Sequence, residues 1–273
     1  MIKDLMVHLD GTADDATRLA LAEMLADRYK AHIGGLFVNA MPGFALSADA
    51  AGTGALVMAD LVERTVSEGD KTEATIRERL GKLAVPHDLQ RLDAIADQAG
   101  IQAARIARHA DLFIGLRPEA GQSGGAWIGL IEAVLFGCGR AVLLAAPKRN
   151  PTPFKTIVVG WNGSREATRA VREAMPFLEK ATKVIVVTAE KNPSEDSLDT
   201  RIARHLDRHG VKVTLHDLRS RDPGDAILAE ADSCEADLIV TGGYGHSRFR
   251  EWMLGGVTRT LLERATRPLL LAH

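Results

Sequence analysis

The sequence has few cysteines, few aromatic residues and no marked excess of charge of either sign. Its two cysteines, Cys138 and Cys234, lie far apart and belong to no CxxC or Cys/His pattern, so we expect reduced thiols rather than a disulfide or a zinc site. Aromatic residues make up only 4% of the chain, which argues against stacking platforms for single-stranded nucleic acid. The 34 Lys and Arg residues nearly balance 36 Asp and Glu residues, giving a net charge of -2. This balance predicts no basic face for nucleic acid.

Long apolar runs are also missing. No stretch of about 18 apolar residues occurs. The apolar stretch at the N-terminus is short and interrupted by charged residues, which is not typical of a signal peptide. We therefore expect a cytoplasmic protein without a membrane span. What the sequence does have is 46% hydrophobic and 26% charged residues in 273 positions, a composition and length that suit one large or two ordinary globular domains.

The chain contains an internal duplication. Five features recur in the same order: an apolar run, a turn with glycine and a Thr or Ser that can cap a helix, a β-rich run, an Ala-Asp-apolar run and an apolar closing run. One such match would mean little, whereas five in order indicate that the chain has duplicated. The pairs are 2–9 and 154–161, Asp10-Gly11-Thr12 and Asn162-Gly163-Ser164, 32–38 and 183–188, 110–114 and 236–240, and 140–144 and 267–271.

Each half is predicted to alternate five short apolar strands with four amphipathic helices, which indicates a parallel sheet covered on both faces. We therefore predict an α/β protein with two tandem doubly wound, five-stranded, Rossmann-like domains, 1–146 and 154–273, joined by a linker at 147–153. The Ala-, Gly- and Ser-rich segment 40–54 is expected to form a mobile excursion within the first domain. The strands are expected near 2–9, 32–39, 87–92, 111–115, 140–145, 155–161, 183–189, 211–218, 237–242 and 267–272, and the helices near 13–30, 56–84, 95–109, 124–138, 165–178, 195–209, 224–233 and 256–265.

The most informative stretch is a glycine-rich loop in the second half. Thr241-Gly242-Gly243-Tyr244-Gly245 is followed, after nine residues, by Gly255-Gly256-Val257-Thr258. The loop begins where a strand ends and finishes where a helix begins, the place where open parallel sheets bind ligands. Glycines let a backbone approach an anion closely, and the N–H groups of residues 256–258 would point at a phosphate from the helix N-terminus. The pattern predicts phosphate binding, with a glycine-rich turn that only caps a strand as the alternative.

This loop resembles that of the universal stress protein family, whose nucleotide-binding members carry G-x2-G-x9-G-(S/T) after the fourth strand. Gly242, Gly245 and Gly255 match the three glycines, and the stretches 242–259 and 161–171 are similar to a proteobacterial tandem branch. The resemblance implies an adenine nucleotide alpha hydrolase-like fold and ATP or AMP as the ligand, with or without Mg²⁺. It also implies site residues: Gly160 and Trp161 flanking the ribose and base, main chain near Ala189 reading adenine, and Thr241 beneath it.

Two departures from the family pattern predict a weakened site. Gly256 stands where the family has Ser or Thr, so one phosphate-binding hydroxyl is missing, and Thr258 could partly replace it. Asn162 stands where the family has the ribose-binding Asp, and it can accept a hydrogen bond but carries no charge. Losing one charge-assisted hydrogen bond costs about 1.5–3 kcal/mol, or roughly ten- to a hundredfold in affinity.

The first half does not repeat the glycine loop. Leu116-Arg117-Pro118-Glu119 follows the strand where the second half has glycines. Asp10 is retained after the first strand, but a lone Asp there is more often a turn or cap residue than a ribose ligand. We interpret the first half as a degenerate partner domain.

Three functions remain open. The sequence favours a stress-response regulatory protein that binds an adenine nucleotide in its C-terminal domain. A slow ATPase or nucleotide-dependent transferase is the second, although no P-loop lysine is present. A ligand-free interaction scaffold is the third. No catalytic residue and no metal ligand is predicted, because the pair His205 and His209 lacks carboxylate or thiol support.

Partners follow from the duplication and the family resemblance. The short apolar runs 140–145 and 267–272 are expected to face each other, giving an intramolecular pseudo-dimer. Further homodimerisation and a protein partner remain open, and neither a nucleic acid nor a membrane is expected.

Overall fold

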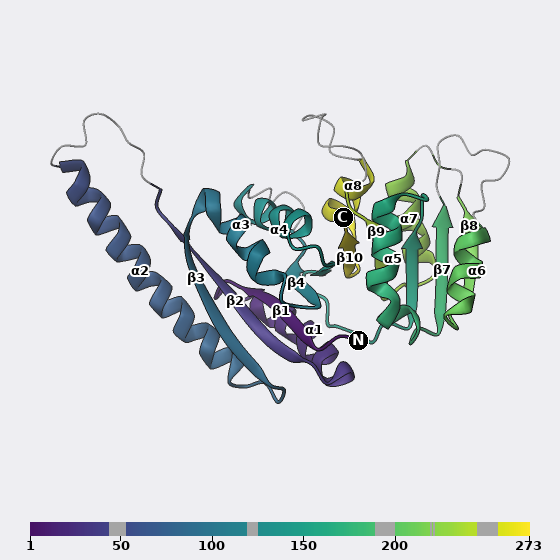
Figure 1. Cartoon of the computed structure of the whole chain (residues 1–273), viewed down its shortest axis with the longest axis horizontal. Coiled ribbons are helices and arrows are strands. Elements are labelled where there is room, and N and C mark those ends of the chain that lie inside the picture. The colour runs from purple at the N-terminus through teal and green to yellow at the C-terminus, as the bar shows by residue number, and fades with distance from the viewer. Residues whose placement is uncertain (44–52, 119–124, 189–199, 219, 221, 245–255) are drawn as a thin grey trace.

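The computed structural model describes residues 1–43, 53–118, 125–188, 200–218, 220, 222–244 and 256–273. Within these residues, ten strands form one sheet in the order β3-β2-β1-β4-β5-β10-β9-β6-β7-β8 (Figure 1). Read outward from the centre, each half has its strands in the same relative order. The described part of the chain therefore confirms the doubly wound, five-stranded topology expected for both halves.

The first half spans residues 1–146 and the second half residues 154–273. In the first half the elements are β1 (Asp4–Leu9), α1 (Asp15–Tyr29), β2 (His32–Met41), α2 (Thr53–Leu80), β3 (His87–Ile95), α3 (Ala96–Ala107), β4 (Leu112–Leu116), α4 (Gly125–Gly137) and β5 (Val142–Ala145). In the second half they are β6 (Thr156–Gly160), α5 (Arg165–Leu178), β7 (Lys183–Thr188), α6 (Thr200–Arg208), β8 (Val213–Asp217), α7 (Pro223–Ser233), β9 (Leu238–Gly242), α8 (Gly256–Arg264) and β10 (Leu269–Ala272).

The two halves join through their last strands. β5 and β10 pair in antiparallel fashion, with Leu269 opposite Leu144 and Leu271 opposite Val142, whereas the pairings within each half are parallel. All these side chains are fully buried. The expectation that the runs 140–145 and 267–272 face each other is confirmed, and the reason is that two apolar edges cover each other.

The sheet has one hydrophobic core on each face. Buried residues of α1, α2, α5 and α6 form a cluster with one face of the strands. Buried residues of α3, α4, α7 and α8 form a second cluster on the other face. Helices α4 and α8 therefore lie on the same face of the continuous sheet, one from each half.

Two helix starts in the second half follow directly from capping residues. The Ser164 hydroxyl accepts a hydrogen bond from Ala167 N at 3.1 Å and begins α5. The Asp222 carboxylate accepts from the N–H groups of Gly224 and Asp225 and begins α7. The Ser164 cap confirms the one expected from the sequence.

Two expectations for the first half are wrong. Thr12 does not cap α1, because its hydroxyl donates to Asp10 Oδ1 at 2.6 Å and the helix begins only at Asp15. The segment 40–54 is not wholly an excursion: Ala40 and Met41 extend β2 by pairing with β3, and the first turn of α2 includes residues 53 and 54. The rest of the expected excursion, from residue 44 to residue 52, lies outside the described residues.

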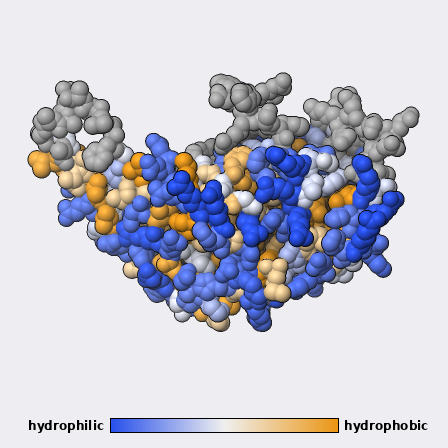
Figure 2. Space-filling view, in the orientation of Figure 1, coloured by the Kyte–Doolittle hydropathy of each residue, from blue (hydrophilic) through white to orange (hydrophobic). Residues whose placement is uncertain are grey.

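The outer flank of the first half is the long helix α2 (Figure 1). Apolar side chains gather near its first turns on the face that Figure 2 shows, among mostly hydrophilic neighbours. Leu56 is 73% exposed and Val57 is 67% exposed. Among the helices of the described residues, α2 included, none is long and apolar enough to cross a membrane.

Candidate functional site

The candidate site lies at the carboxyl ends of β6 and β9, where the strand order of the second half reverses. β6 pairs with β7 on one side and with β9 on the other, so the chain leaves β6 and β9 in opposite directions along the sheet. A crevice at such a point is the usual ligand position in an open α/β sheet. Gly160 lies opposite Thr241 in this register, so the two predicted segments lie side by side.

The β6 side of the site consists of Gly160, Trp161 and Asn162. A Cβ atom at position 160 would lie 3.2 Å from Thr241 Oγ1, so a side chain there would press against buried Thr241. The side chain of Trp161 is buried in the core on the α5 face, and the residue is 8% exposed. Its backbone N–H donates to Val187 O at 2.8 Å. Asn162 is exposed, and its side-chain oxygen accepts a hydrogen bond from Ser164 N at 3.1 Å.

The β9 side begins with two glycines that helix packing requires. A Cβ atom at Gly242 would lie 2.6 Å from Ala167 N, in the backbone at the start of α5. A Cβ atom at Gly243 would lie 3.0 Å from Leu135 Cδ2 in α4 of the first half. The absence of side chains at both positions is therefore explained by the close approach of one helix from each half.

The start of α8 is open at its first residue and anchored at its third. Gly256 is exposed, and a Cβ atom there would have no neighbour within 4 Å in the part of the chain that the structure describes. Val257 is half-buried. Thr258 is 4% exposed, and its hydroxyl oxygen accepts a hydrogen bond from Tyr244 N at 3.2 Å. Its hydroxyl therefore ties α8 to the end of β9.

Tyr244 connects this site to the first half. Its hydroxyl donates to Glu132 Oε1 of α4 at 2.7 Å, and its ring centroid lies 5.2 Å from that of Phe136. Burial, and then the hydrogen bond and negative charge of Glu132, raise the pKa of the Tyr244 phenol above its usual range. His273 contributes to the same cluster, with its ring 4.6 Å from Phe136 and its Nδ1 3.1 Å from Gly243 O.

The sequence singles out further residues at this edge that lie outside the described residues. They are Ala189, Gly245 and Gly255. Glu119 also lies outside the described residues; it is the last residue of the first-half stretch 116–119, which stands where the second half has glycines.

At the corresponding edge of the first half, a buried ion-pair network lies beside an open hollow of about 280 Å³, which residues 10–12 line together with Lys71, Thr72 and Thr75 of α2. Arg18, 1% exposed, lies 2.6 Å from both Asp10 Oδ1 and Asp15 Oδ1. Asp15 is fully buried and also lies 2.7 Å from Arg79 of α2. A Cβ atom at Gly11 would lie 2.6 Å from Thr72 of α2, so this helix packs directly on the turn after β1.

Asp10 is a turn residue, as expected, because its carboxylate accepts from Thr12 N at 3.0 Å. Its second role was missed: it is an ion-pair partner of Arg18. The only local signal for this network was the spacing of Asp15 and Arg18, three residues apart on α1, since Arg79 comes from another helix.

Three titrating groups of this network are shifted by burial and by Arg18. Burial, and then the Arg18 charge, lower the pKa of His8 to about 3. Burial alone would raise the pKa of Asp10, but hydrogen bonds and charge from Arg18 outweigh it, so that the pKa is lowered to about 2. Burial raises the pKa of Asp15. His8 is therefore neutral in the folded protein at every pH at which its unfolded counterpart would titrate.

His8 should make the fold sensitive to mild acid. Because its folded pKa lies below its unfolded pKa of about 6.5, its contribution is fully present above that pH and is lost as the pH falls toward about 3. Between pH 6.5 and pH 5 we expect the wild type to lose about 2 kcal/mol more unfolding free energy than the variant His8→Gln. Urea unfolding of both proteins at the two pH values measures this difference. If the unfolding free energy of the two proteins fell equally between these pH values, the lowered pKa of His8 would be contradicted.

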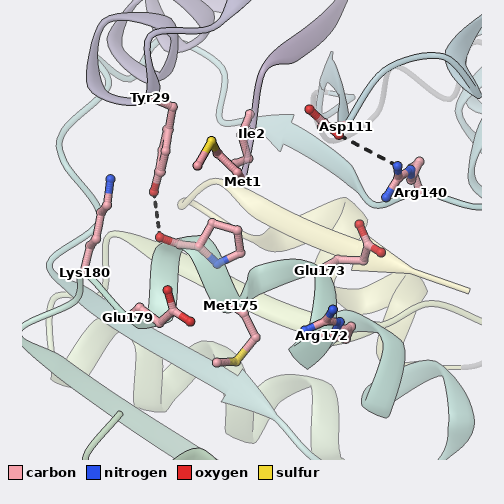
Figure 3. A pocket seen from close by; sticks show the side chains of 11 residues that line it. Met1, Ile2, Tyr29, Asp111, Arg140, Arg172, Glu173, Met175, Glu179 and Lys180 are labelled. Atoms are coloured by element: carbon pink, nitrogen blue, oxygen red, sulfur yellow. Dashed lines mark hydrogen bonds and ion pairs between the residues drawn. The ribbon is translucent and has the colours of Figure 1, made fainter. Parts of the chain in front are cut away.

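A cavity of about 470 Å³ lies elsewhere, between α5 and the first half (Figure 3). The Tyr29 hydroxyl closes one side by donating to Pro176 O at 2.8 Å, and Asp111 and Arg140 approach to 3.8 Å on another. Arg140, Arg172 and Lys180 are matched by three acidic side chains, so the lining has no excess of either sign that would select an anion. The acidic residues are Asp111, Glu173 and Glu179.

Metal-binding groups do not gather in the described residues. No cluster of three or more His, Cys, Asp or Glu side chains occurs there that could hold an ion. The rings of His205 and His209 contact each other, with centroids 4.9 Å apart.

The comparisons with known proteins all point to the same family. A family model described as the universal stress protein family matches residues 186–273. A universal stress protein of Mycobacterium tuberculosis is 31% identical over 144 residues, an alignment that covers 44% of this chain and 97% of that protein. A second universal stress protein of that organism is 30% identical over 135 residues, covering 44% of this chain and 49% of the relative. The crystal structure of a universal stress protein from Archaeoglobus fulgidus superposes with a TM-score of 0.75 at 15% identity, covering 98% of this chain and 95% of that one, which shows the shared fold.

Proposed function

The chain belongs to the universal stress protein family, and we propose that it is a stress-response regulatory protein whose second half binds an adenine nucleotide, AMP or ATP. The observation that carries this proposal is the open start of α8 at the switch point of the second sheet. Gly256 is exposed, and no side chain of the described residues approaches it. An anion can reach the first N–H groups of the helix, where the dipole also favours negative charge.

The contrast between the halves supports the second as the binding half. At the same edge of the first half, Arg18 and Asp15 form a buried ion pair and α2 packs on the turn at Gly11. The second half has Ala167 and Ala170 at the aligned helix positions, counting from the aligned Gly11 and Gly163 turns. Its exposed Asn162 and Gly256 leave the edge accessible. We propose accordingly that residues 1–146 form a degenerate partner domain, that 147–153 are the linker, and that 154–273 form the nucleotide-binding domain.

The proposed site residues divide by role. The N–H groups of Gly256 and Val257 bind phosphate, the Asn162 side chain binds the ribose, and main chain at Gly160, Trp161 and Ala189 lies against the ribose and base. The remaining residues shape the loop. They are Thr241, Gly242, Gly245, Gly255 and Thr258, of which Gly242 admits α5 and Thr258 holds Tyr244.

Substitutions at Gly256 test the phosphate position without disturbing the core. Gly256→Asp places a carboxylate at the helix start, where it suits the dipole but repels a phosphate, so we expect AMP and ATP affinity to fall more than tenfold. Gly256→Ser restores the family hydroxyl and should tighten binding by about tenfold. Gly256→Ala adds the same Cβ atom without a polar group and is the matched control. Calorimetry of the full chain with each nucleotide measures the three affinities.

The same series separates the proposal from its alternatives. Affinities that are equal in the Asp, Ser and Ala variants would place any bound nucleotide elsewhere. Absence of binding by the wild type, together with absence of co-purified nucleotide after denaturation of fresh protein, would favour the scaffold. Turnover of ATP with Mg²⁺ by the wild type would favour the slow ATPase or transferase.

A further inference from the structure

We propose that the first half positions the helix that binds phosphate in the second half. Arg117 holds the C-terminal end of α8, and Glu132 holds its N-terminal end through Tyr244. This inference rests on the proposed function, because it assigns a role in nucleotide affinity to residues that belong to the half without a glycine loop. Its test is chosen so that the two can fail separately.

Arg117 reaches across the molecule to the last turn of α8. Its Nη1 donates to Leu262 O at 2.9 Å and lies 3.2 Å from Glu263 O. These carbonyls belong to the last four residues of the helix, whose carbonyl groups have no partner within the helix. Arg117 is 9% exposed, so its charge acts in a poorly solvated place. It satisfies the carbonyls and complements the negative end of the α8 dipole.

The position of Arg117 is equivalent to that of Gly243. Arg117 N donates to Ala145 O at 3.0 Å, and Gly243 N donates to Ala272 O at 2.8 Å. Each acceptor is the last residue of the final strand of its half. The first half therefore has a long cationic side chain where the second half has a glycine, and that side chain serves the helix of the other half.

Tyr244 provides the second connection, at the opposite end of α8. Its hydroxyl is held by Glu132 at 2.7 Å, and its N–H is held by the hydroxyl of Thr258, in the first turn of α8, at 3.2 Å. Tyr244 also has a φ of 56°, in the left-handed region that non-glycine residues avoid. Side-chain contacts to α4 therefore keep a strained backbone in place where the chain leaves β9.

Together these contacts hold a helix of nine residues at both ends from one neighbouring half. A phosphate bound at residue 256 and a guanidinium at residues 262 and 263 act on the same short dipole, about 10 Å apart at 1.5 Å per residue. Changes in the first half should therefore alter nucleotide affinity without touching the ligand. By thermodynamic reciprocity, the nucleotide should in turn stabilise α4 of the first half.

The experiment compares variants of the two connections, Arg117 and Tyr244, in the full chain. We expect Arg117→Gln to weaken AMP binding by about tenfold and Arg117→Lys, which keeps the charge, to recover part of the loss. Tyr244→Phe removes one hydroxyl and should weaken binding by about fivefold. Arg169→Gln is the matched control, because it removes a 2.9 Å arginine–carbonyl bond between the halves, to Gly139 O, that does not involve α8. We expect its affinity to equal that of the wild type.

A second readout distinguishes positioning from general stability. Hydrogen exchange of the α4 amides should slow when AMP binds to the wild type, and this protection should be reduced in Tyr244→Phe even at saturating nucleotide. If the wild type binds AMP but Arg117→Gln and Tyr244→Phe bind equally well and α4 shows no protection, the inference is overturned and the proposed function stands. If the wild type binds no nucleotide, both are overturned.

Discussion

Replacing Arg18 with methionine is expected to lower the free energy of unfolding by about 3 kcal/mol, measured by urea unfolding at pH 7. Removing one member of a buried ion pair costs about 3–5 kcal/mol, because the remaining charge stays buried. Asp15 is fully buried, and without Arg18 it keeps only Arg79 and the N–H groups of Asp10 and Gly11 as partners. We expect the lower end of the range for that reason.

Two controls make this result specific to burial. Arg64→Met breaks an ion pair with Asp60 whose side chains are 71% and 57% exposed, and such surface pairs contribute about 0–1 kcal/mol. The double variant Asp15→Asn, Arg18→Met removes both buried charges and should recover part of the loss, because Asn has the volume of Asp and can still accept a hydrogen bond from the N–H groups of the turn. A loss below about 1 kcal/mol in the single variant would show that the network is solvated.

The sequence was sufficient for the architecture because the architecture depends on local patterns and on the repeat. Apolar runs and amphipathic helices recur in order in both halves, and the observed elements follow the predicted ranges within a few residues. Even the pairing of β5 with β10 was predictable, since both runs are almost wholly apolar and both close their halves. Capping by Ser164 was visible for the same local reason.

Long-range polar contacts were beyond the sequence. Arg18, Asp15 and Arg79 come together from two helices, and Arg117 and Tyr244 cross between the halves. A charge in a sequence is most often a solvated one, so no pattern marks these side chains as buried or paired. The failed cap at Thr12 has a local cause instead, because its hydroxyl donates to Asp10, two residues earlier in the same turn.

The glycine loop shows a different limit. The sequence places Gly242 and Gly256 in one motif and assigns both to phosphate binding, but only coordinates separate a glycine required by packing from one that leaves an open surface. Gly242 lies against the backbone of α5, whereas no atom of the described residues lies near the missing side chain of Gly256. These two positions therefore make opposite predictions for the same substitution.

Gly242→Ala is expected to lower the free energy of unfolding by about 3 kcal/mol, the upper end of the usual cost of overpacking. The new Cβ atom would lie 2.6 Å from Ala167 N and 2.7 Å from the Glu166 carbonyl carbon. Because both are backbone atoms, no rotamer change can relieve the contact, and the start of α5 must move.

Gly256→Ala should be neutral or stabilising by up to about 1 kcal/mol, since alanine favours a helix more than glycine does and the site is open. Urea unfolding of the two variants measures the contrast directly. Moving the start of α5 would also displace Ser164 and, through their 3.1 Å hydrogen bond, Asn162, so the nucleotide affinity of Gly242→Ala should fall with its stability. Equal stabilities for the two variants would contradict the packing argument, because they would mean that α5 shifts without cost.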